Sequence, residues 1–158
     1  MTKIMIMGIL MCGGAGAIAA ETPIEVANSR ADARTPEAVK AADAAWLEAE
    51  INGDYKFLDW FLLDGYQSID ATGSIFSRAA LIENRHRRGR SDEFAKQVRE
   101  WREQHPNHAE MKIYRDTAVL TWVADDRNSK APVYSCDIFV YQNRHWHAIY
   151  SQHSTAGV

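Results

Sequence analysis

The chain has 158 residues, of which 46% are hydrophobic and 25% charged, enough apolar material for the core of one globular domain. Its formal net charge of -3 and its pI near 6.1 exclude a general attraction to nucleic acid or anionic lipid, which needs clustered Lys and Arg. We therefore expect a single domain whose partner is a small molecule rather than a nucleic acid.

Residues 1–19 have the pattern of a signal peptide. Lys3 precedes an apolar run over 4–11, and small residues follow as far as an A-x-A cleavage site at 17–19. A retained membrane anchor would need about 20 strongly apolar residues, and glycines and alanines dilute the second half of this segment. Lipidation at Cys12 is another alternative, although the residue before it is not small. We predict cleavage after Ala19 and a periplasmic or secreted protein that no longer contacts the membrane.

The segment 20–34 is polar, mixed in charge and without apolar periodicity, which predicts a flexible leader. The first helix begins after it. Thr35-Pro36-Glu37 combines an N-cap hydroxyl, a proline at the first helical position and an acid in the first turn. Apolar residues at helical spacing, including Trp46, continue the helix to about Ile51. We place the folded domain at 35–154.

Three shorter elements are expected next. Asn52-Gly53 separates the first helix from a second, short one, which Asp64-Gly65 ends. A strand over 66–70 closes in a turn at 71–73, and Ser77 caps a third helix that runs to about Arg85.

The basic segment 85–90 precedes a helix expected over 91–104. It has two interpretations. The segment is either a surface helix with a solvated basic turn, or a lid over a pocket mouth whose arginines collect an anionic group of the ligand.

The second half of the chain is rich in strands, expected over 111–114, 118–124, 132–141 and 146–153. Helices followed by an antiparallel meander are typical of the α+β class. Both faces of the strand 132–141 are largely apolar, with Tyr134, Ile138 and Val140 on one of them. A sheet covered by helices on one face only should have a polar second face, so we predict that this face meets another subunit in a homodimer.

Three short motifs in this order resemble the nuclear-transport-factor-two-like superfamily, which includes ketosteroid isomerases and SnoaL-like polyketide cyclases. They are Ala49-Glu50-Ile51-Asn52-Gly53-Asp54, Ser68-Ile69-Asp70-Ala71-Thr72-Gly73, and Asp137-Ile138-Phe139-Val140-Tyr141 with Trp146. The resemblance implies a cone-shaped, curved antiparallel sheet wrapped around the N-terminal helices, with one pocket.

The resemblance also implies site residues. In ketosteroid isomerases one Asp is the general base, and a second, neutral Asp donates a hydrogen bond to the oxyanion together with a Tyr. These positions fall on Asp70, Asp137 and Trp46 in this chain. Trp46 departs from the pattern, because indole has no phenol acidity.

The residues also have purely structural interpretations. Asp137 lies in an apolar strand, so it is protonated, paired with a cation or capping group, or facing a wet cavity. Asp70 could equally be an ordinary turn former. In the family's register, His147 and His153 would share a face with Asp137, where His153 is a plausible proton relay.

Three aromatic residues, Trp46, Tyr66 and Trp122, could line a pocket for a flat apolar ligand or simply fill the core. We expect no metal and no cofactor, because His147 and His153 would lie roughly 20 Å apart on one strand. The sequence thus predicts a pocket protein for a small, mostly apolar molecule that could carry out isomerase or lyase chemistry. The alternative is an inert dimeric binding or interaction domain of the same fold.

Overall fold

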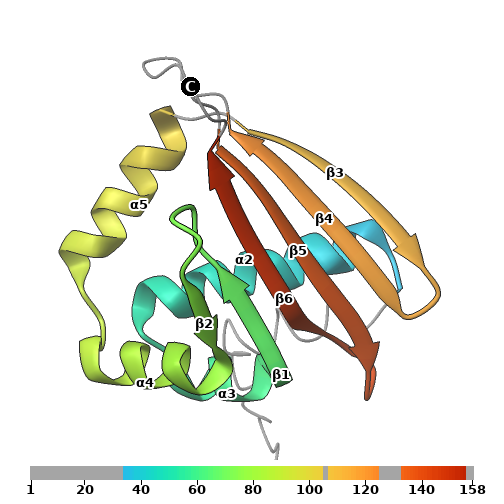
Figure 1. The fold of residues 1–158 in the computed structure, drawn as a ribbon, viewed down its shortest axis with the longest axis horizontal. Coiled ribbons are helices and arrows are strands. Elements are labelled where there is room, and N and C mark those ends of the chain that lie inside the picture. Colours follow the sequence, from blue (N-terminus) through green and yellow to red (C-terminus); the bar gives the residue numbers. More distant parts are fainter. Residues whose placement is uncertain (1–33, 105–106, 125–132, 156–158) are drawn as a thin grey trace, which may run out of the picture.

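A computed structural model describes residues 34–104, 107–124 and 133–155 (Figure 1). The helices are α2 (Pro36–Asn52), α3 (Tyr55–Phe61), α4 (Arg78–Arg88) and α5 (Asp92–Gln104). The strands are β1 (Leu62–Ile69), β2 (Ile75–Ser77), β3 (Asn107–Tyr114), β4 (Thr117–Ala124), β5 (Val133–Gln142) and β6 (His145–Thr155). The α+β class is confirmed. None of the described helices is long and apolar enough to span a membrane. The predicted signal peptide lies outside the described residues, and so does the leader except for Arg34.

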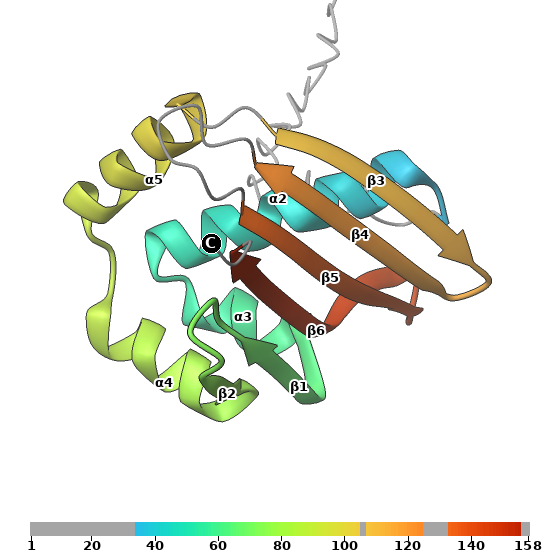
Figure 2. The same ribbon diagram turned by 45° about the horizontal axis from the view of Figure 1, so that its top comes forward.

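The six strands form one curved sheet in the order β2-β1-β6-β5-β4-β3. α2 crosses one face of this sheet, and α3 and α4 lie beside β1 and β2 (Figures 1 and 2). The sheet is mixed rather than antiparallel as predicted, because β1 pairs with β6 in parallel. Two distant parts of the sequence therefore meet beside α2.

The ends of α2 form as the sequence predicts. The Thr35 hydroxyl accepts a hydrogen bond from the Ala38 amide at 3.2 Å, and Gly53 ends the helix in the left-handed conformation with φ 67°. A Cβ atom at Gly53 would collide with the backbone carbonyl group of Gly89. The end of α4 thus lies directly against the end of α2, and both helices contribute to the cavity wall described below.

The core lies between α2, α3 and the face of the sheet that carries Phe139 and Trp146, both fully buried. Trp46 of α2 packs its ring 6.2 Å from that of Phe139 and 5.7 Å from that of Phe61. On the other face of β5, Tyr134 is 42% exposed. The sheet thus presents one packed face and one open face within the described part of the chain.

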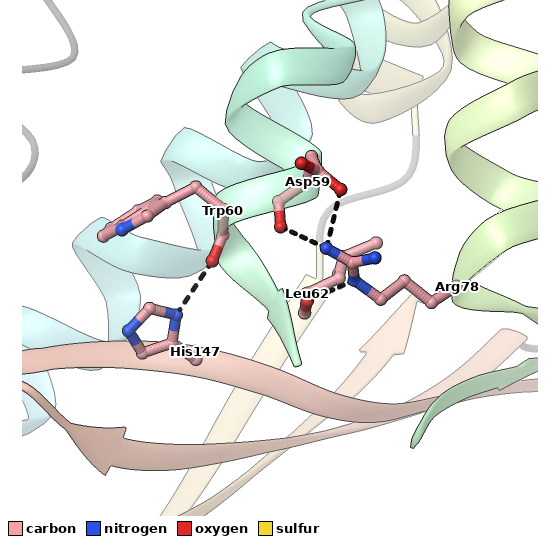
Figure 3. Close-up of polar contacts among 5 residues, drawn as sticks. All are labelled: Asp59, Trp60, Leu62, Arg78 and His147. Atoms are coloured by element: carbon pink, nitrogen blue, oxygen red, sulfur yellow. Dashed lines mark hydrogen bonds and ion pairs between the residues drawn. The ribbon is translucent and has the colours of Figure 1, made fainter. Parts of the chain in front are cut away.

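The junction of α3 and β1 differs from the prediction. Asp64-Gly65, expected to stop the second helix, lies inside β1, which begins at Leu62 directly after α3. Arg78 of α4 holds this junction by donating to the carbonyl oxygens of Asp59 and, at 2.7 Å, Leu62 (Figure 3). The short strand β2, which pairs only with β1 among the described strands, has no counterpart among the predicted elements.

Candidate functional site

A cavity of about 230 Å³ lies between α2, β1, β2, α4 and β6. Aromatic and aliphatic side chains share its wall with ionisable ones. The described lining residues are Trp46, Glu50, Tyr66, Ser68, Asp70, Phe76, Ala80, Leu81, Asn84, Arg85, Ser151 and His153. Four of the sequence-predicted site residues, Trp46, Tyr66, Asp70 and His153, are therefore brought together.

One wall of the cavity carries an ion pair that sequence reasoning missed. Arg85 donates to Glu50 Oε2 at 2.8 Å, and the side chains of the two residues are only 16% and 22% exposed. Trp46 Nε1 donates to the other oxygen, Oε1, at 3.2 Å. The signal was the spacing, because Glu50 follows Trp46 by one helical turn and shares its side of the helix.

A buried carboxyl lies behind the opposite wall. Asp137 of β5 is 6% exposed and accepts a hydrogen bond from the Ser151 hydroxyl at 2.6 Å. The same hydroxyl lies 3.5 Å from His153 Nε2, and both Ser151 and His153 line the cavity. A chain of polar groups thus connects the buried carboxyl with an exposed imidazole at the cavity.

Burial raises the pKa of Asp137, and the charge of Glu50 raises it further. The hydrogen bond from Ser151 and the nearby His153 act in the opposite direction. The pKa of the Tyr66 phenol is also raised, chiefly by burial. Both groups therefore favour their protonated forms, in which each has an O–H to donate.

Asp43 of α2 is a second, half-buried acid that the sequence analysis did not select. Burial, together with the charge of Asp137, raises its pKa to about 7, while Arg102 of α5 acts against this. It lies two helical turns before Glu50 and three residues before Trp46, so an acid at helical spacing beside an apolar face was the available signal. The carboxyls of Asp43 and Asp137 interact across α2 and the sheet.

Asp70 lies at the cavity rim, in the turn between β1 and β2. Its Oδ1 atom accepts hydrogen bonds from the Thr72 amide, the Thr72 hydroxyl and the Ser74 amide, at 2.9, 2.6 and 3.0 Å. These bonds, the one from the Thr72 side chain foremost, lower the pKa of Asp70. The contacts of Asp70 are thus those of a turn-forming residue. Because a carboxylate with a lowered pKa is a weak base, these contacts make Asp70 less suited to the role of general base.

His147 does not share a face with His153, contrary to the prediction. The register between β5 and β6 shifts at a bulge, so that His153 pairs with Ser135 but His147 pairs with Val140. Directly paired residues share a face, and Ser135 and Val140 lie on opposite faces of β5. His147 is buried beside α3, where its Nδ1 atom lies 3.2 Å from the Trp60 carbonyl oxygen (Figure 3).

Trp122 lies outside the described cavity lining as well. It is half-buried in β4, opposite Ser135, and packs against the hydrophobic core. The described residues contain no group of three or more His, Cys, Asp or Glu side chains placed to hold a metal ion. The described cavity lining offers carboxyl, hydroxyl, guanidinium, amide and imidazole groups beside aromatic and aliphatic ones.

No protein-family model and no curated protein matches the sequence. Solved structures do match. An NTF2-like protein from Cytophaga hutchinsonii aligns with a TM-score of 0.52 at 12% identity, over 73% of this chain and 93% of that one. An NTF2-like protein with a cystatin-like fold from Novosphingobium aromaticivorans gives 0.51 at 13% identity, over 75% and 79%. A candidate dehydratase of the NTF2-like family from Streptomyces avermitilis gives 0.51 at 13% identity, over 76% and 94%.

These similarities confirm the resemblance to the nuclear-transport-factor-two-like superfamily at the level of the fold. The chain has a cystatin-like, NTF2-like α+β fold, with the mixed curved sheet around α2. At this identity the fold carries no reaction with it, because function depends on the residues of the site.

Proposed function

We propose that the cavity binds a small, mostly apolar molecule and catalyses an acid–base reaction on it, of the isomerase or lyase type. The observation that carries this proposal is the buried Asp137 carboxyl, joined at 2.6 Å to Ser151 on the cavity wall. A carboxyl whose pKa is raised by burial, reached through a hydroxyl from a ligand cavity, is typical of a general acid.

The proton path follows from the contacts. When the Asp137 carboxyl is protonated, its O–H can take over as the donor in the 2.6 Å contact with Ser151 Oγ, and the Ser151 hydroxyl then turns toward the ligand or toward His153, 3.5 Å away. In that arrangement a proton leaving Asp137 passes to Ser151 Oγ while the Ser151 hydroxyl proton passes on to the ligand or to His153. Tyr66 adds a neutral phenol O–H to the same wall. Hydrogen-bond donors arranged in advance around a developing negative charge on a ligand oxygen stabilise the transition state.

The cavity volume limits the size of the molecule. Cavities of about 150 Å³ hold benzene, so 230 Å³ suits a substituted single ring or a short chain. The aromatic rings of Trp46, Tyr66 and Phe76 on the wall suit a flat apolar body. A four-ring steroid exceeds this space.

An inert binding domain of the same fold is the second candidate, and the contacts of Asp70 favour it. The carboxylate at the family's base position is engaged in its own turn, with its pKa lowered. If no other group takes the role of the base, the cavity binds without turnover. Export and a homodimer remain part of the proposal, on the sequence patterns of 1–19 and of the outer face of β5.

The binding part is tested with two alanines of α4. Both Ala79 and Ala80 are exposed, but only Ala80 lines the described cavity. Cyclohexanone binding, measured by ligand-observed NMR, should be lost in Ala80→Trp and kept in Ala79→Trp. Equal binding by both variants would place the ligand elsewhere.

The catalytic part is tested by exchange of the α-hydrogens of cyclohexanone in D₂O, followed by NMR. The wild type should accelerate exchange over buffer, and Asp137→Asn should lower the acceleration by about 100-fold, the scale of general acid–base catalysis. Asp70→Asn, measured in parallel, decides whether the rim carboxylate is the base. If the wild type exchanges these hydrogens no faster than buffer alone, the enzyme hypothesis is contradicted and the inert binding domain is the function that is left.

A further inference from the structure

Three of the four arginines in the basic segment 85–90 contact other groups of the protein, and the fourth, Arg87, is exposed. Arg85 pairs with Glu50 at 2.8 Å. Arg88 donates to the Glu50 carbonyl oxygen at 2.8 Å and lies 4.0 Å over the ring of Phe94. Arg90 pairs with Asp92 at 2.9 Å. This arrangement argues against the interpretation in which these arginines collect an anionic group.

Glu50 is the counter-charge of two half-buried guanidinium groups, those of Arg85 and Arg88. The Nε atoms of Arg85 and Arg88 are buried and have no hydrogen-bond partner among the described residues, so neither cation is fully solvated. Burial and the neighbouring Arg85 lower the pKa of Arg88, while the charge of Glu50 raises it. The same negative charge reaches across the cavity to Tyr66 and Asp137, whose pKa values it raises.

On the cavity wall the positive charge of Arg85 is therefore neutralised by Glu50, and the carboxylate of Asp70 makes the rim negative. Among the described lining residues the carboxylates are Glu50 and Asp70, and Arg85 is the one arginine or lysine. A ligand carboxylate entering this space meets Glu50 already bound to Arg85, and placing like charges side by side is unfavourable. An uncharged molecule meets no such repulsion.

We propose that Glu50 determines the charge specificity of the cavity: by neutralising Arg85 it selects an uncharged, single-ring-sized ligand and excludes the corresponding anion. This inference rests on the proposed ligand cavity and names its ligand class. Glu50 acts through Arg85 and is a specificity residue, not a catalytic one.

The test uses three probes of nearly equal shape and different charge: benzamide, benzoate and benzamidinium. Their dissociation constants are measured by calorimetry at pH 7.5. The wild type should bind benzamide at least about tenfold more tightly than benzoate, the ratio that 1.4 kcal/mol of repulsion produces. Glu50→Gln leaves Arg85 without its counter-charge while keeping an acceptor for Trp46 Nε1, so benzoate should become equal to or better than benzamide.

Two further variants separate this effect from a loss of folding. In Glu50→Gln/Arg85→Gln both charges of the ion pair on the cavity wall are removed, while Arg88 can keep its hydrogen bond to the backbone carbonyl oxygen at position 50, and the preference for benzamide should return. In Arg85→Gln the carboxylate of Glu50 loses its ion-pair partner, and the affinity for benzamidinium should rise at least about tenfold. Circular dichroism checks that each variant is folded.

The outcomes distinguish the two proposals. If the wild type binds benzoate as tightly as benzamide, or if Glu50→Gln leaves their ratio unchanged, the role of Glu50 is wrong while the ligand cavity stands. If the wild type binds none of the three probes, the ligand cavity itself is contradicted, and the charge specificity with it.

Discussion

The Nδ1 atom of His147 lies 3.2 Å from the carbonyl oxygen of Trp60, which joins β6 to the last turn of α3 (Figure 3). Carbonyl groups at the end of a helix lack partners within the helix. His147 and Arg78 supply them here from two different elements, so this junction is sensitive to substitution and to pH.

Arg78→Gln should destabilise the fold by about 2 kcal/mol. Arg78 donates to two carbonyl oxygens and forms an ion pair with Asp59 at 2.7 Å, and its side chain is 26% exposed. Hydrogen bonds that involve a charged group are worth about 1.5–3 kcal/mol, and solvent screening reduces the contribution of the exposed Asp59. Urea unfolding measures the change. Arg87→Gln, at an exposed position on the same helix, is the control and should be neutral.

His147 should make the fold sensitive to acid. Burial lowers its pKa, and its Nε2 atom is buried without a hydrogen-bond partner among the described residues. The unfolded state therefore binds a proton at His147 more readily than the folded state does. The contribution of neutral His147 to the free energy of unfolding is fully present above pH 6.5, and it is lost as the pH falls toward the lowered pKa of the folded state. His147→Asn keeps a donor for the Trp60 carbonyl oxygen. Because an ordinary histidine titrates at about pH 6.5, the variant should show a flatter dependence of the free energy of unfolding on pH between about 6.5 and about 5. An unchanged slope would contradict this role.

Asp43 should make the fold less stable as the pH rises, which is the opposite of the effect of His147. Its folded pKa of about 7 lies above the ordinary 3.8, so the folded state binds the proton more tightly. Stability is then fully present at low pH and is lost as the pH rises from near 3.8 to about 7, by an amount on the order of a few kcal/mol. Asp43→Asn should remove this loss. Thermal melting of both proteins at pH 4.5 and 7 measures it, and Asp64→Asn, at an exposed position, is the control.

The open face of the sheet should form a homodimer. Tyr134 is 42% exposed there, and Ile138 lies in a row with Val119 of β4 and Tyr150 of β6. Apolar patches on a soluble protein often mark an interface. Light scattering should give twice the mass of the mature chain, and Ile138→Lys should give a folded monomer, whereas Ala79→Lys on α4 should remain dimeric. A monomeric wild type at micromolar concentration would show that the face has another use.

The exported protein should begin at Ala20, because the A-x-A site at 17–19 follows a short apolar region. Mass spectrometry of the exported material decides this. An intact Met1 in a membrane fraction would indicate an anchor instead, and a lipid on Cys12 would indicate a lipoprotein. Replacing Ala19 by Trp should block cleavage and leave the precursor uncut.

Much of the local structure could be predicted from the sequence because it depends on neighbouring residues. The caps at Thr35, Gly53 and Ser77 formed where the sequence placed them. They consist of hydrogen bonds within one turn of the chain. The strand β2 and the start of β1 were missed, because each depends on pairing with another strand: β2 pairs with β1, and Leu62 at the start of β1 pairs with Ala148 of β6.

The sequence by itself determined the α+β class and the helix caps, and it selected Asp137, Trp46 and Tyr66 as candidates, because apolar periodicity and local caps express short-range physics. Only the tertiary structure decided which polar groups share a cavity. The end of α4 lies against the end of α2, where Arg85 meets Glu50, and the bulge in β6 separates His147 from His153. Such contacts join residues tens of positions apart, and a single shift in register reverses the face of a side chain, so no local pattern encodes them.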